Sequence, residues 1–126
     1  MPIASSLLDK PRLMKKLRDF YAYVQKNDGK VGQKTRGIDL NFNNACNLRC
    51  KYCFTNSPKG DHVKEYLDIN AIKKLADEAD ELGFFEFDLQ GGELLLQPKK
   101  LFQVLEAIRP ERFYMYLTTN GFYLDE

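Results

Sequence analysis

The chain of 126 residues contains no tryptophan, one histidine and three cysteines, and its formal net charge is only +1. A charge so close to neutral excludes the strong basic field that attracts nucleic acid or an anionic membrane surface, so we expect neither partner. No apolar run approaches the roughly 20 residues of a membrane-spanning helix. The first residues, MPIASSLLDKPRLMKK, lack the apolar core and cleavage site of a secretory signal. We therefore expect a cytoplasmic protein, in which cysteines stay reduced.

What is present is the composition of a globular protein, with 44% hydrophobic and 29% charged residues in a length typical of one domain. Residues 1–36 are predicted to form an amino-terminal helix and a linker. Apolar residues that recur on one face indicate the helix, with Asp9 as a possible cap and Pro11 in the first turn. These apolar residues are Leu13, Met14, Leu17, Phe20, Tyr21 and Val24. Glycines and charges over 27–37 indicate the linker.

Residues 37–126 alternate between strand and helix patterns. Three segments alternate apolar residues as strands do, namely Gly37–Phe42, Phe84–Gln90 and Arg112–Gly121. Two helices are predicted between them, one after Asp68 that stops at Gly83 and one over Pro98–Arg109. This order predicts an α/β fold with a parallel sheet and right-handed crossovers. Because three strand–helix units leave one face and one edge of the sheet uncovered, we expect the front part of a larger barrel.

Side-chain parity predicts which way each strand faces. Ile38, Leu40 and Phe42, with Phe85, Phe87 and Leu89, are expected to face the outer helices. Asp39, Asn41, Glu86, Asp88 and Gln90 would then face the barrel interior, which is unusually polar for such a position. The charged positions of the helices, including Asp77 and Asp80, are expected to be solvated.

All three cysteines lie in the segment ACNLRCKYCF, as Cys46, Cys50 and Cys53. A structural zinc site favours four ligands, and His62 is the only histidine that could be the fourth. A ferredoxin-type cluster needs a fourth cysteine, which the chain lacks. Inert buried thiols would not account for the spacing. A cubane iron–sulfur cluster with one iron left without a protein ligand uses three thiols, and a small molecule can bind that iron.

The other two strand ends carry residues suited to a ligand site. Gly91, Gly92 and Glu93 follow the second predicted strand, and Thr118–Gly121 ends the third. Glycine allows a backbone to approach a ligand closely. Because the carboxyl ends of parallel strands share one rim, we expect these segments and the cysteines to converge there.

The segment CNLRCKYCF resembles the cluster motif of the radical S-adenosylmethionine (radical SAM) superfamily, with Tyr52 in its aromatic position. GGE at Gly91–Glu93 resembles the motif that follows the second strand of that superfamily. LTTNG, ending at Gly121, resembles the third-strand end of its peptide-modifying and molybdenum-cofactor branches. The resemblance covers residues 37–124, and it departs from the family at Leu94, where proline is usual.

The resemblance implies a partial (β/α)6 TIM-like barrel, of which residues 37–126 would supply the first three strands and two helices. It implies that the three cysteines hold a 4Fe-4S cluster whose fourth iron is chelated by the methionyl amine and carboxylate of S-adenosylmethionine, and that reductive cleavage gives a 5′-deoxyadenosyl radical. Implied cofactor-binding residues are Tyr52, Gly91, Gly92, Glu93 and Asn120, with Glu93 accepting a hydrogen bond from the methionyl ammonium.

The partners implied are a peptide or small-molecule substrate and an external electron donor of the flavodoxin or ferredoxin type. Tyr52 and Phe54 are expected to shield the cluster or pack against the barrel. The alternative is an iron–sulfur or zinc-binding module without turnover.

Overall fold

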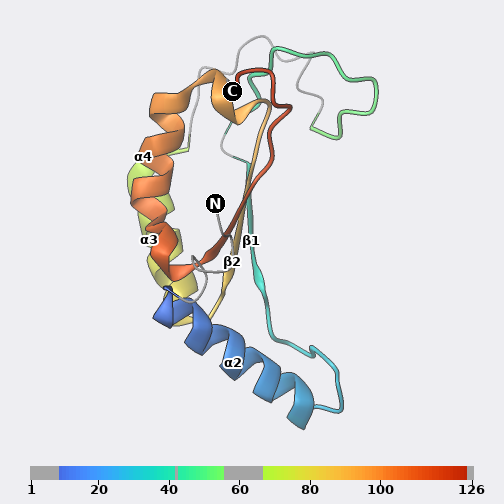
Figure 1. Ribbon diagram of the computed structural model, residues 1–126, viewed down its shortest axis with the longest axis vertical. Helices are drawn as coiled ribbons and strands as arrows, with labels where there is room; N and C mark the ends of the chain where they lie inside the picture. Colours follow the sequence, from blue (N-terminus) through green and yellow to red (C-terminus); the bar gives the residue numbers. More distant parts are fainter. Residues whose placement is uncertain (1–8, 42, 56–66, 125–126) are drawn as a thin grey trace.

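The computed structural model describes residues 9–41, 43–55 and 67–124, which form a three-stranded sheet with helices on one face (Figure 1). In chain order the elements are α2 (Pro11–Lys26), β1 (Gly37–Asn41), α3 (Ile69–Glu81), β2 (Glu86–Gln90), the 3-10 turn η2 (Leu94–Leu96), α4 (Pro98–Ile108), the 3-10 turn η3 (Pro110–Arg112) and β3 (Tyr114–Leu117). The strands pair in parallel in the order β1-β2-β3. This confirms the α/β fold class with its preceding helix. No helix of the described part is long and apolar enough to cross a membrane.

The helix ends follow local sequence signals. The Asp68 carboxylate accepts hydrogen bonds from the first-turn amides of α3, and Gly83 follows that helix with φ +83°. Helix α4 ends at Arg109, whose φ of 60° lies in the left-handed region, and Pro110 prevents continuation.

The prediction that Asp9 caps the first helix is wrong. Lys10 occupies the N-cap position and makes no side-chain capping bond. Its ammonium instead donates to the carbonyl oxygens of Pro110 and Phe113, at 2.9 and 3.0 Å. The Lys10 side chain therefore bonds to η3 and to the residue before β3, and it does not cap its own helix.

The sheet face that packs on α3 and α4 is apolar, as parity predicted. Register places Leu40 beside Leu89 and Phe87 beside Met115, and these residues meet the helices in one core. The rings of Phe87 and Phe113 stack edge to face with centroids 4.8 Å apart. Phe42 lies outside the described residues.

Phe85 departs from this pattern. It precedes β2, is buried, and packs its ring against Phe20 of α2 with centroids 5.0 Å apart. Tyr21, also expected on the buried face of α2, is 63% exposed. Helix α2 thus packs at the amino-terminal end of the sheet through Leu13 and Phe20, away from the carboxyl ends of the strands (Figure 1).

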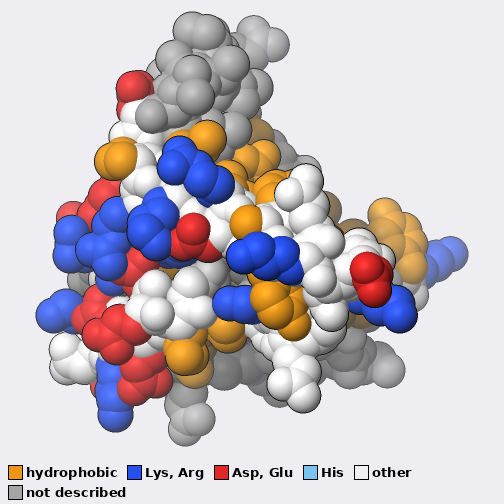
Figure 2. Space-filling view, turned by 90° about the horizontal axis from the view of Figure 1, so that it is seen from below, with side chains coloured by type: hydrophobic (Ala, Val, Ile, Leu, Met, Phe, Trp, Pro, Cys, Tyr) orange, Lys and Arg blue, Asp and Glu red, His pale blue; other side chains and the backbone are white. Residues whose placement is uncertain are grey.

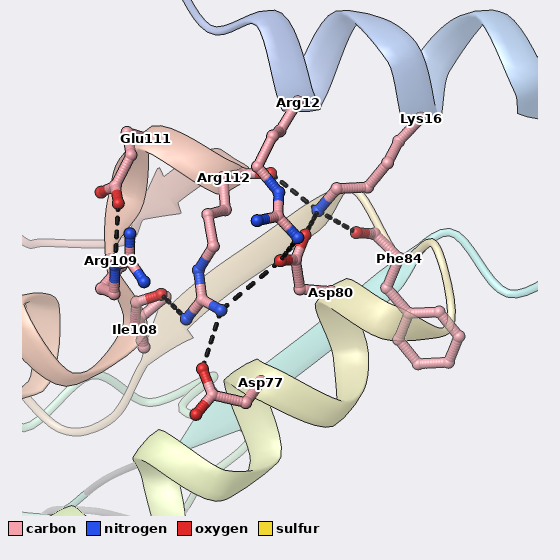
Figure 3. Close-up of polar contacts among 9 residues, drawn as sticks. All are labelled: Arg12, Lys16, Asp77, Asp80, Phe84, Ile108, Arg109, Glu111 and Arg112. Carbon is pink, nitrogen blue, oxygen red and sulfur yellow. Dashed lines mark hydrogen bonds and ion pairs between the residues drawn. The ribbon is translucent and has the colours of Figure 1, made fainter.

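A buried ion network fixes α2 to α3 and to the segments that precede β2 and β3 (Figure 3). The Lys16 ammonium lies 2.6 Å from an Asp80 carboxylate oxygen and donates to the carbonyl oxygens of Phe84 and Arg112. The Arg112 guanidinium donates to Asp77 at 2.8 Å and lies 3.5 Å from Asp80, and Arg12 also pairs with Asp80. The Asp80 side chain is only 3% exposed, so its expected solvation is wrong.

The charges in this network shift its titrations. Burial alone would raise the pKa of Asp80, but Lys16, Arg12 and Arg112 together hold that pKa below its ordinary value. Burial, together with the two arginines, lowers the pKa of Lys16 despite its bond to Asp80. Around this core the surface of the same end mixes basic and acidic side chains (Figure 2).

Candidate metal and cofactor site

The carboxyl ends of the three strands converge, as predicted, and backbone hydrogen bonds join them. The Gly92 amide donates to the Asn43 carbonyl at 2.9 Å, and the Glu93 amide donates to Ala45 at 2.7 Å. The Thr118 amide donates to the Leu89 carbonyl at 3.1 Å. The start of the cysteine loop therefore runs beside the glycine segment as a continuation of the β1–β2 ladder.

The two glycines are needed because this approach is so close. A Cβ atom at Gly91 would lie 2.6 Å from the Asn43 carbonyl oxygen, and one at Gly92 would overlap the Ala45 carbonyl. The prediction was that glycine allows a close approach of backbone to ligand. The close approach in the structure is between the glycine segment and the loop that carries the cysteines.

Glu93 is fully buried and holds two elements together. Its Oε1 accepts from the Leu95 amide at 2.8 Å and from the Thr119 hydroxyl at 2.6 Å. Its Oε2 accepts from the Asn120 amide at 2.8 Å. A carboxylate offers about four acceptor positions, so one on Oε2 is not used by these bonds. The expected bond to the methionyl ammonium would use that position and stays a prediction.

Asn120 lies at the same rim and contacts the cysteine loop. Its Nδ2 donates to Asn47 Oδ1 at 3.0 Å, and its Oδ1 accepts from the Phe122 amide at 3.0 Å. Sequence reasoning named Asn120, included Thr119 only as part of the Thr118–Gly121 segment, and missed Asn47. The sequence offered one indication of Asn47, which is that it directly follows Cys46 in the cysteine segment.

The three cysteines are half-buried, lie in one loop and form no disulfide. Cys46 Sγ accepts from the Leu48 amide at 3.4 Å, and the Cys53 amide donates to the Cys50 carbonyl at 3.2 Å. Cys53 Sγ lies 3.2 Å from the Thr55 hydroxyl oxygen. Across residues 9–41, 43–55 and 67–124, no three Cys, His, Asp or Glu side chains are already arranged as a metal-binding group.

The donor set nevertheless fits an iron–sulfur cluster chemically. Thiolates are the usual ligands of such clusters, and three of them lie within eight residues on a surface loop. His62, the one other candidate ligand considered, lies outside the described residues.

The aromatic residues of the loop face solvent. Tyr52 is 90% exposed and Phe54 is 83% exposed, so the expected packing of these rings against the barrel is not observed. Arg49 and Lys51 are exposed as well. The loop thus presents aromatic and cationic side chains around the thiols.

The sheet face opposite the helices carries the polar side chains, as parity predicted. A hollow of about 230 Å³ on this face is lined by Gly37, Ile38, Asp39, Glu86, Asp88 and Tyr116. Register places Asp39 directly beside Asp88. Burial raises the pKa of Asp88, and the nearby charge of Asp39 raises it further to a smaller extent. A hydrogen bond from Gln90 opposes that rise.

The described residues form an α/β protein in which a three-thiol loop and a glycine turn meet at the carboxyl ends of three parallel strands. The family model of the radical SAM superfamily matches residues 40–126, which is most of the chain. The chain therefore belongs to the radical SAM superfamily.

Among similar proteins, a GTP 3′,8-cyclase of Trichodesmium erythraeum is 37% identical over 86 residues, which cover 64% of this chain and 26% of that protein. A GTP 3′,8-cyclase of Synechocystis is 32% identical over 95 residues, covering 75% and 29%. An S-adenosylmethionine-dependent nucleotide dehydratase of Fibrobacter is 28% identical over 100 residues, covering 73% and 29%. The chain spans about a quarter to a third of the length of the curated relatives it matches. No solved structure matches it.

Proposed function

We propose that residues 37–126 supply the first three strands and two helices of a radical SAM enzyme core. Cys46, Cys50 and Cys53 hold a 4Fe-4S cluster, and S-adenosylmethionine binds beside it. The observation that carries this proposal is a loop of three thiols held against the Gly91–Glu93 segment by two backbone hydrogen bonds. When bound, the cluster and S-adenosylmethionine supply an electron and a 5′-deoxyadenosyl radical, which abstracts hydrogen from substrate.

The chain's own residues bind and orient these groups. The three thiolates ligate iron and leave one iron for the cofactor. Gly91 and Gly92 let the cysteine loop pack directly against the end of the second strand. Glu93 and Asn120 line the cofactor site from the second and third strand ends, and Tyr52 covers the cluster side once the loop closes.

The substrate is proposed from two sources. The LTTNG segment resembles peptide-modifying enzymes, which suggests a peptide. The names of the relatives refer to GTP and nucleotides, which favours a small-molecule substrate of the nucleotide class. In either case the polar face with Asp39, Glu86 and Asp88 would line the barrel interior.

The electron comes from an external donor of the flavodoxin or ferredoxin type in this proposal. Arg49 and Lys51 lie on the exposed part of the cysteine loop and offer positive charge to an acidic partner. A cytoplasmic location would keep the three thiols reduced before cluster assembly.

The experiment compares metal content after anaerobic reconstitution in the wild-type chain, Cys50→Ala and His62→Ala. We expect about four irons per wild-type chain, loss of the cluster in Cys50→Ala because a cubane loses one of three thiolates, and retention in His62→Ala. Iron and zinc are measured by elemental analysis. Zinc in the wild type, lost when His62 is replaced, would instead support the alternative of a zinc-binding module without turnover.

A further inference from the structure

We propose that Asn47 and Asn120 form a clamp that positions the Cys46 thiolate for cluster binding. Both are positioning residues in this role, and the inference rests on the proposed function. The observation is the side-chain hydrogen bond of 3.0 Å from Asn120 Nδ2 to Asn47 Oδ1, between residues 73 positions apart in the chain.

The clamp closes a ring of hydrogen bonds around the rim. The start of the cysteine loop is bound to Gly92 and Glu93 through the Asn43 and Ala45 carbonyls. The buried Glu93 carboxylate is bound in turn to the Thr119 hydroxyl and the Asn120 amide. The Asn120 side chain then returns to Asn47, so the ring links all three strand ends.

The Asn120 side chain is held ready for this contact. Its Oδ1 accepts from the Phe122 amide, which leaves Nδ2 pointing at the loop. Its own amide is fixed by a fully buried carboxylate. The donor therefore lies in the segment after β3, and the acceptor belongs to the cysteine loop.

The clamp acts at the first cysteine. Asn47 follows Cys46 directly, and the next amide, of Leu48, donates to Cys46 Sγ at 3.4 Å. The bond of the Leu48 amide is local to the loop, whereas the bond of Asn47 ties the loop to the segment that follows β3. Holding Asn47 therefore holds the amide-to-sulfur geometry of Cys46.

The first arm of the test needs no metal. The metal-free, reduced chain is alkylated with iodoacetamide, and cleavage by trypsin after Arg49 and Lys51 puts each cysteine on its own peptide. Loss of one hydrogen bond should speed labelling of Cys46 about 2- to 10-fold in Asn47→Ala and in Asn120→Ala. The double variant should match Asn120→Ala, because that variant already removes the bond to Asn47 together with the bond from the Phe122 amide. Cys53 and the remote control Asn70→Ala should change little.

The second arm measures the midpoint potential of the reconstituted cluster. We expect a more negative potential in Asn120→Ala, because the Leu48 amide no longer holds its bond to the Cys46 sulfur. An unchanged Cys46 labelling rate, equal acceleration at all three cysteines, additive effects in the double variant or an unchanged potential would each overturn the clamp. A wild-type chain that takes up no iron would contradict the proposed function, while the labelling rates would still decide the clamp.

Discussion

The variant Gly92→Ala should lose the iron–sulfur cluster almost completely. A Cβ at this position would overlap the Ala45 carbonyl, which belongs to the loop that carries the cysteines. Neither side of the contact can yield easily, because both are backbone and the Glu93 amide donates to that same carbonyl. Relief of the overlap costs about 1–3 kcal/mol and moves the cysteine loop away from the rim. The measurement is iron per chain after anaerobic reconstitution.

A matched glycine variant separates this effect from ordinary strain. Gly83 has φ +83°, and a Cβ there would meet nothing within 4 Å. Gly83→Ala should therefore lose about 1 kcal/mol of stability through its left-handed backbone but keep its iron. If Gly92→Ala bound as much iron as Gly83→Ala, the close approach of the two segments would not be what positions the cysteines.

The variant Asp80→Asn should lower the free energy of unfolding by about 3–5 kcal/mol. The Asp80 carboxylate is the shared partner of Lys16, Arg12 and Arg112, and its side chain is 3% exposed. Removal of the negative charge leaves the buried Lys16 ammonium without an anionic partner and leaves Arg112 with Asp77 alone. Since domains of this kind are stable by only about 5–15 kcal/mol, the loss removes a large part of the total. Urea unfolding followed by circular dichroism measures it.

The control is Asp19→Asn, which removes an exposed carboxylate that pairs with Lys15 on the same helix. Exposed pairs contribute little, so this variant should unfold at nearly the wild-type urea concentration. Equal effects of the two variants would mean that the buried network does not hold α2 to α3.

The effect of Asp80 also sets a pH dependence. Its pKa is lowered in the folded chain, so its contribution is complete above the ordinary value of 3.8 and is lost as pH falls through the lower folded value. The wild type and Asp80→Asn should therefore differ most near neutral pH and converge in acid. Lys16 has the opposite pH dependence. Its pKa is lowered in the folded chain, so burial of its charged ammonium lowers stability at neutral pH, and this loss is relieved as pH rises toward 10.5.

Much of the fold follows from local signals that act over a few residues. Asp68, Gly83 and Pro110 end or begin helices by their own chemistry, and strand parity separates Leu40 and Phe87 from their polar neighbours. These features depend on spacing along the chain, and the sequence displays that spacing directly.

What sequence reasoning missed depends on contacts between distant segments. Asp77 and Asp80 look alike on a charged helix face, yet only Asp80 lies under α2 and becomes buried. Phe85 shares the parity of Phe87 but packs on Phe20, because α2 covers that end of the sheet. Thr119 and Asn47 join the site only through Glu93 and Asn120, and no local pattern shows such a relation.

Electron paramagnetic resonance of the reconstituted, reduced chain before and after addition of S-adenosylmethionine tests the central claim most directly. Three thiolates leave one iron for a small-molecule ligand, so we predict a reduced-cluster signal whose spectrum changes when S-adenosylmethionine is added. Absence of a cluster, or a cluster signal that S-adenosylmethionine leaves unchanged, would contradict a site built to bind that cofactor at iron.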